Sequence, residues 1–159
     1  MTDRKEGAMI THQRHFACAV ICRRTREGLQ ALVFESVTTN PRTGRAGKIK
    51  LKFPGGMQKG LETAFETMTR EVQEETGLKV TGARRVYERE SPENRKIIQF
   101  GFLVEIDDCT GVLHTRGMRD GNTTLSKPTW VDVRVILRGG LIDNHHRMFL
   151  AALRDFRRC

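Results

Sequence analysis

Residues 56–78 constrain the fold of this chain more than any other stretch, because they combine five glutamates, one arginine and three glycines. Thr63 is followed three residues later by a glutamate, which is the spacing of a capping box, so a helix should begin near Ala64. Gly77 suits the left-handed position that follows a last helical turn. The helix should therefore end at about Thr76.

This helix is predicted to have two contrasting faces. At about 100° per residue, Phe65, Met68 and Val72 lie on one face, which we expect to pack on the core. Three carboxylates share an arc of roughly 100° away from that face, and they belong to Glu71, Glu74 and Glu75. Carboxylates one turn apart repel each other, and hard divalent ions such as Mg²⁺ or Mn²⁺ favour oxygen ligands, so the arc is a candidate metal site. The alternative is a solvated acidic face.

The spacing of the whole stretch is more specific than its acidity. Its defining positions are Gly56, Glu62, Arg70, Glu71, Val72, Glu74, Glu75, Gly77 and Leu78. This is the complete pattern of the Nudix box, and Pro54-Gly55 ahead of it is also similar to the family. The chain therefore resembles the Nudix hydrolase family.

The resemblance implies an α/β fold, namely the Nudix-type α/β/α sandwich with a mixed β-sheet. It also implies a divalent-metal-dependent pyrophosphohydrolase that cleaves the diphosphate linkage of a nucleoside diphosphate derivative, such as a nucleoside triphosphate. The catalytic and metal-binding positions that it implies are Arg70, Glu71, Glu74, Glu75 and the backbone carbonyl of Gly56. Glu62 would support the site by pairing with the arginine across the turn, and Gly77 would end the helix.

One position departs from the family pattern. Several relatives carry an additional glutamate a few residues before the tryptophan of the last strand, where it serves as a ligand or base. In this chain residues 121–129, which precede Trp130, contain no carboxylate, and the nearest one before them is that of Asp120. Either Asp120 takes that role at the substrate, or the box glutamates act alone.

Apolar runs and alternation predict the strands of the sheet. Residues 16–22 are almost wholly apolar, as expected of a central strand that is buried on both faces. Further strands are predicted at residues 29–37, 48–53, 80–90, 96–106 and 130–133. The strands at 80–90 and 96–106 are close enough to form a hairpin, whereas residues 38–47 and 107–126 should be mostly loop.

The strand predicted at residues 48–53 alternates apolar side chains with lysines, which places Lys48, Lys50 and Lys52 on one face. That face leads into the metal loop. Lys52, and then Lys50, are therefore candidates for contacts with substrate phosphates. The alternative is a row of lysines that simply faces solvent.

The two ends of the chain are predicted as follows. Residues 1–13 are polar and should form a flexible leader, with a single domain at 14–159. Asp143 should cap a C-terminal helix, whose amphipathic face contains Phe149, Leu150, Leu153 and Phe156. His145 and His146 open that helix but point about 100° apart, so a solvated helix start is favoured over a chelating pair.

Composition restricts the partners. There are 28 Lys and Arg residues against 19 Asp and Glu, and the formal charge of +9 favours nucleotides, RNA ends or other polyanions, unless it serves solubility alone. The four cysteines form no CxxC pair, and reduced thiols in a cytoplasmic protein are expected. No apolar span is long enough for a membrane helix. Nothing in the sequence indicates an oligomeric state.

Three functional classes follow from these patterns. The first is a metal-dependent pyrophosphohydrolase acting on nucleotides or, alternatively, on RNA 5′ ends. The second is a non-catalytic nucleotide sensor of the same fold, which would be expected to lack a box glutamate, and none is missing. The third is a nucleic-acid-binding module, but one Tyr and one Trp provide no aromatic-rich RNA signature.

Overall fold

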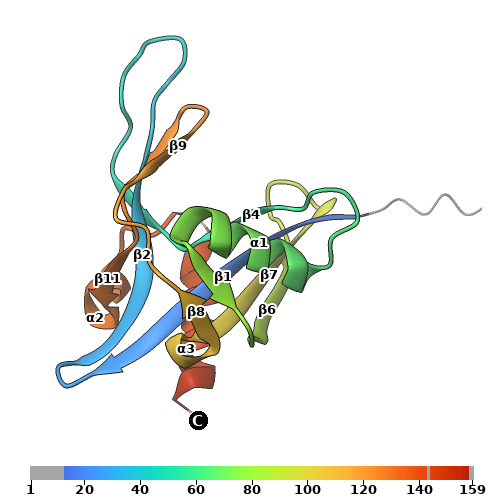
Figure 1. The fold of residues 1–159 in the computed structure, drawn as a ribbon. Helices are drawn as coiled ribbons and strands as arrows, with labels where there is room; N and C mark the ends of the chain where they lie inside the picture. The colour runs from blue at the N-terminus through green and yellow to red at the C-terminus, as the bar shows by residue number, and fades with distance from the viewer. Residues whose placement is uncertain (1–12, 143, 158–159) are drawn as a thin grey trace, which may run out of the picture.

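The computed structural model describes residues 13–142 and 144–157, and its sheet lies between helices (Figure 1). The first elements are strands β1 (Arg14–Thr25), β2 (Gly28–Thr38), β3 (Lys50–Lys52) and β4 (Gly55–Met57) and helix α1 (Ala64–Thr76). They are followed by β5 (Leu78–Val80), β6 (Arg84–Glu90), β7 (Ile97–Glu105), a 3₁₀ turn (Ile106–Asp108) and β8 (Cys109–Gly111). The last elements are β9 (Met118–Asp120), β10 (Thr123–Leu125), β11 (Thr129–Asp132), α2 (Val133–Leu137) and α3 (His145–Phe156).

Strand β1 is the centre of the sheet. It pairs in parallel with β7 and antiparallel with β2 and β4. Cys18 and Val20 belong to a core that includes the apolar face of α3, whereas Ala17 and Ala19 belong to a second core with α1. Successive side chains of a strand point to opposite faces, so β1 contributes to both layers. The predicted α/β/α sandwich with a mixed sheet is therefore confirmed.

Helix α1 begins and ends where its capping signals predicted. The Thr63 hydroxyl accepts a hydrogen bond from the Glu66 N–H at 3.2 Å, and the Glu66 carboxylate accepts one from the Thr63 N–H at 3.3 Å. Gly77 adopts a φ of 82° and donates its N–H to the Gln73 carbonyl. A side chain at this position would be strained, because only glycine adopts the left-handed conformation without cost.

The apolar face of α1 differs from the prediction at one residue. Met68 and Val72 are fully buried, but Phe65 is 39% exposed and meets the ring of Phe102 edge-on at the border of the core. The helix buries Ala64 and Thr67 as well. The contact face is therefore rotated away from Phe65.

Two of the predicted strands are shorter than expected. The strand predicted at 80–90 is interrupted after Val80, because Thr81 donates its N–H and its hydroxyl to the Asp108 carbonyl. As a result β5 pairs with β8, and only β6 forms the predicted hairpin with β7. The strand predicted at 48–53 is reduced to β3, and Ile49 is 63% exposed rather than buried.

Residues 107–126 were predicted as mostly loop, but they contain β8 and a hairpin of β9 and β10. Thr123 pairs with Asp120 across Gly121-Asn122, a dipeptide typical of a tight hairpin turn. A short helix, α2, also follows β11 without having been predicted, and the Asp132 carboxylate caps it by accepting the Arg134 N–H at 2.8 Å.

The C-terminal helix forms as predicted, but Leu150, which was placed on its apolar face, is 40% exposed, and its first residue is not solvated. His145 is 2% exposed, its Nδ1 accepts the Phe53 N–H at 3.2 Å, and its ring stacks on Phe53. Burial lowers the pKa of His145 to about 3, so the ring is neutral. His146 is exposed as predicted, and Asp143, the predicted cap, lies outside the described residues. No helix within the described residues is long and apolar enough to cross a membrane.

Candidate active site

The box opens onto a cleft of about 630 Å³ between α1 and the β9–β10 hairpin. Its acidic wall contains Gly56, Glu71, Glu74 and Glu75. The remaining lining residues come from β1, the segment from β3 to the loop before α1, and the hairpin, and they are Arg14, Phe16, Lys52, Gly55, Met57, Gln58, Lys59, Met118, Arg119, Asp120, Thr123 and Leu125. The structure thus brings the box residues into one cleft with residues that are distant in sequence.

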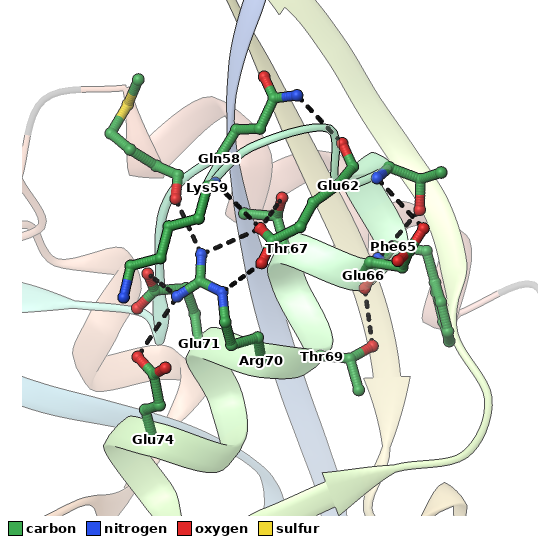
Figure 2. Close-up of polar contacts among 12 residues, drawn as sticks. Gln58, Lys59, Glu62, Phe65, Glu66, Thr67, Thr69, Arg70, Glu71 and Glu74 are labelled. Atoms are coloured by element: carbon green, nitrogen blue, oxygen red, sulfur yellow. Dashed lines mark hydrogen bonds and ion pairs between the residues drawn. The ribbon is translucent and has the colours of Figure 1, made fainter.

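Arg70 connects the loop before α1 to the acidic arc of the helix (Figure 2). Its Nε and Nη2 donate to the two oxygens of Glu62 at 2.6 and 3.1 Å, and Nη2 also donates to the Met57 carbonyl at 3.0 Å. Its Nη1 donates to Glu71 at 2.8 Å and to Glu74 at 3.3 Å. One guanidinium therefore holds the loop against the helix and neutralises part of the acidic arc.

Glu62 fixes the loop from its other side. Besides Arg70, its carboxylate accepts the Lys59 N–H at 3.1 Å and the Thr67 hydroxyl at 2.9 Å. These hydrogen bonds, above all that from Arg70, lower the pKa of Glu62 to about 2. Glu62 is thus ionised throughout the physiological range, and it acts on the cleft only through the residues that it holds.

The carboxylate of Glu71 lies directly over Gly56. A Cβ atom added at Gly56 would collide with both oxygens of that carboxylate. A side chain at this position would therefore displace the Glu71 carboxylate, whereas the backbone itself would accept one, since Gly56 does not adopt a positive φ.

Glu75 is the residue whose environment differs most from the prediction. It was placed on an exposed arc, yet it is only 6% exposed and accepts the Gly55 N–H at 2.7 Å. Its second oxygen pairs with Lys52 Nζ at 3.4 Å. Burial raises the pKa of Glu75 to about 7, although Lys52 and the Gly55 N–H oppose this shift. Glu74, by contrast, has a side chain that is 48% exposed.

The lysines of the β3 segment separate into two kinds. Lys52 lines the cleft, but its ammonium group is engaged by Glu75 and by the Gly55 carbonyl at 3.3 Å. Lys50 is exposed and does not line the cleft. The structure thus shows Lys52 in the role of an internal counter-ion, rather than as part of a continuous lysine row.

The donor set of the cleft suits a hard divalent cation, because carboxylate and carbonyl oxygens are the ligands that such ions prefer. Within residues 13–142 and 144–157, however, no three His, Cys, Asp or Glu side chains converge as a metal-binding group. In the structure these carboxylates have other partners: Arg70 holds Glu71 and Glu74, while Lys52 and the Gly55 N–H hold Glu75. The oxygen donors of the cleft therefore fit a divalent cation, and in this structure the three carboxylates pair with Arg70 and Lys52 instead.

Sequence reasoning missed much of the wall opposite the box. Asp120, which was a candidate from the sequence, lies on β9 and lines the cleft, but Met118, Arg119 and Thr123 from the same hairpin were not predicted to do so. The Gly121-Asn122 turn was the signal that could have placed this hairpin. Phe16 was predicted only as part of a core strand, yet it also borders the cleft.

The comparisons with known proteins agree with this geometry. The family model described as NUDIX domain matches residues 11–153. This chain belongs to the Nudix hydrolase family. No curated protein matches the chain.

Several solved structures share the fold. The NUDIX domain of NrtR from Shewanella oneidensis, crystallised with ADP ribose, aligns with a TM-score of 0.68 and 14% identity over 98% of this chain and 99% of that one. The E. coli ORF135 protein aligns with a TM-score of 0.60 and 20% identity over 91% and 92% of the two chains. A MutT NUDIX hydrolase from Burkholderia pseudomallei aligns with a TM-score of 0.59 and 18% identity over 87% and 96%.

Proposed function

We propose that this chain is a divalent-metal-dependent pyrophosphohydrolase that cleaves the diphosphate linkage of a nucleoside diphosphate derivative, with a nucleoside triphosphate or related nucleotide as the preferred class. The single observation that carries the proposal is that Gly56, Glu71, Glu74 and Glu75 line one cleft of about 630 Å³, a volume suited to a ligand of nucleotide size.

The residues that would hold Mg²⁺ or Mn²⁺ are Glu71, Glu74, Glu75 and the carbonyl of Gly56. Such an ion, when bound, neutralises charge on phosphate oxygens and lowers the pKa of a bound water. Arg70 positions two of these carboxylates through its hydrogen bonds and fixes the loop through Glu62. Lys52 does the same for the third carboxylate.

The reaction needs few further groups from the protein. Water attacks one phosphorus, the bond from that phosphorus to the bridging oxygen breaks, and the leaving phosphate keeps the electron pair. A box carboxylate accepts the proton of the water. Positioning and charge neutralisation dominate such a reaction, which is why the site consists of carboxylates held by cations.

The nucleoside part of the substrate would meet the less polar wall of the cleft. Phe16, Met118 and Leu125 line it alongside the box, and apolar and aromatic side chains are typical of the surface that receives a nucleobase. ADP ribose, bound by the Shewanella NrtR domain, is itself a nucleoside diphosphate derivative and supports this substrate class.

The free thiols of Cys18, Cys22 and Cys109 are compatible with the cytoplasmic location that we also propose.

The test is a screen with Mg²⁺ and, in parallel, with EDTA. The substrates are nucleoside triphosphates, dinucleoside polyphosphates, nucleotide sugars and a short 5′-triphosphate RNA. All products are separated and identified by anion-exchange chromatography, because nucleotide sugars and dinucleoside polyphosphates release neither free phosphate nor pyrophosphate. We expect metal-dependent hydrolysis of at least one group, with polyphosphorylated substrates preferred over nucleotide sugars. Binding of these compounds without turnover at any metal concentration would instead indicate a sensor and overturn the proposal.

A further inference from the structure

Two β-hairpins project together from the sheet beside the cleft, and we call them the arm, defined as residues 37–50 and 116–124. Figure 1 shows the long connection after β2 and the hairpin that carries β9 rising on the same side of the molecule. They are joined because β10 pairs with the end of β2, where Thr123 lies opposite Thr38. The Thr39 N–H also donates to the Asn122 carbonyl at 2.8 Å.

The tip of the arm is a hydrogen-bonded turn. The Asn40 side-chain oxygen accepts the Arg42 N–H at 2.8 Å, and the Asn40 N–H donates to the Arg45 carbonyl at 2.9 Å. Thr39 and Ala46 form a bridge just below the tip. The arm therefore presents its arginines from a defined backbone.

The arm carries more than half of the net charge of +9, because it has six basic residues and one acidic residue, Asp120. The six are Arg42, Arg45, Lys48, Lys50, Arg116 and Arg119, all exposed. None forms an ion pair with any residue that the structure describes. Unpaired cations on one projection create a positive field that attracts polyanions.

The base of the arm is a wall of the cleft. Met118, Arg119 and Asp120 belong to both, as does Thr123. At about 3.3 Å per residue, the chain from Lys52 at the cleft to Ala46 near the tip reaches up to roughly 20 Å. At about 3.4 Å per nucleotide of a stacked strand, this length matches some five or six phosphates. A polyanion that begins in the cleft can therefore continue along the arm.

We propose that the arm binds the phosphate backbone of a single-stranded polynucleotide whose 5′-terminal phosphates enter the cleft, an inference that rests on the proposed function. The cleft has the volume of a small-molecule site, which suits one terminal nucleotide, and the strand that enters it is therefore taken as unpaired at its end. An anionic membrane is the less suitable partner, because only Ile49 and Met118 are exposed large apolar side chains on the arm, and membrane-surface segments need a continuous apolar face.

The test measures binding of a 5′-phosphorylated single-stranded RNA of about 12 nucleotides, a typical site size, by fluorescence anisotropy in EDTA at several salt concentrations. The variant Arg42→Ala/Arg45→Ala should bind roughly tenfold more weakly at low salt. Its slope of log K against log salt should be smaller by about 1.4, because each phosphate neutralised on a single strand contributes about 0.7. The matched control is Arg147→Ala/Arg154→Ala, which removes two exposed arginines from α3, beside a separate groove.

The outcomes separate this inference from the proposed function. The control should bind RNA like the parent, and Arg42→Ala/Arg45→Ala should hydrolyse a free nucleoside triphosphate at the parental rate. The inference is overturned if this variant binds RNA like the parent, if the control loses as much affinity, or if the parent prefers phosphatidylserine vesicles to RNA. Failure of the parent to hydrolyse any nucleotide would count against the proposed function alone, since the binding assay needs no turnover.

Discussion

The site around the Nudix box and the arm are both rich in charged residues, but cations are paired with carboxylates at the site and, within the described residues, unpaired in the arm. Beside the cleft, Arg70 of the box and Lys52 of β3 are engaged by carboxylates and are largely shielded from solvent. In the arm, Arg42 and Arg45 are exposed and have no carboxylate partner within the described residues. Paired charges fix the positions of other groups, whereas unpaired charges remain available to a ligand. We therefore propose that Arg70 and Lys52 position the site and that the arm cations attract a ligand.

The largest difference between the box helix and the arm should appear in how much an introduced charge lowers the stability of the fold. Val72 is fully buried beneath α1, whereas Ile49 on the arm is 63% exposed. Val72→Asp would bury a charge without a partner and should lower the free energy of unfolding by roughly 3–5 kcal/mol, while Ile49→Asp should change it by less than about 0.5 kcal/mol. Urea denaturation measures both, and equal midpoints for the two variants would contradict the orientation of α1 described above.

Arg70→Ala should show that a paired cation positions the site. Its removal leaves Glu62 without its main partner and frees Glu71 and Glu74. We expect a loss of kcat/KM of roughly 10- to 100-fold, with a smaller loss of Mn²⁺ affinity than for Glu74→Gln. Arg45→Ala is the arm control and should hydrolyse a mononucleotide like the parent. Equal losses of kcat/KM in Arg70→Ala and Arg45→Ala would contradict a positioning role that is specific to Arg70.

Lys52→Met tests the internal counter-ion. In EDTA the variant should be less stable by roughly 1–3 kcal/mol, because the buried carboxylate of Glu75 loses a charged partner. The same change should increase Mn²⁺ affinity, since a competing cation has left the cleft. Thermal melting with and without Mn²⁺ measures both effects, and a parental metal-induced shift in Tm would show that Lys52 does not compete with the metal.

The last expected effect is a pH dependence in the metal-free protein. The pKa of Glu75 is raised from its ordinary value of 4.5 to about 7, so the folded state binds more protons than the unfolded state between these values. The contribution of Glu75 to stability is therefore present below about pH 4.5 and is lost as the pH rises to about 7. The difference in unfolding free energy between the parent and Glu75→Gln in EDTA isolates this group. A difference that stays constant from pH 4.5 to 7.5 would contradict the burial of the carboxylate.

The sequence predicted the parts of this molecule that depend on local signals. The capping box at Thr63 and the left-handed Gly77 fixed the limits of α1, and the apolar run at 16–22 predicted the central strand. The box spacing predicted which residues would share a site.

Other features depend on tertiary contacts that no local pattern contains. Helical periodicity placed Glu75 among exposed carboxylates, but β4 lies against that part of α1 and supplies the Gly55 N–H. Polar sequence likewise suggested a solvated His145, although the Phe53 N–H and ring bury it. Apart from Asp120, the opposite wall of the cleft was missed because three-residue strands such as β9 and β10 are too short to produce a periodicity.

The central claim is that the box carboxylates support metal-dependent cleavage of a diphosphate, and a matched pair of variants tests it most directly. Glu74 and Glu88 have side chains that are 48% and 54% exposed, and each pairs with one arginine. With Mg²⁺ titrated to saturation, Glu74→Gln should lose at least about 100-fold in turnover of the best nucleotide from the screen, while its Tm stays parental. This loss is larger than is typical of residues that only hydrogen-bond to the metal ligands. Glu88→Gln should retain parental turnover. Near-parental turnover by Glu74→Gln at saturating Mg²⁺, or equal losses in both variants, would contradict the assignment of the box as the catalytic site.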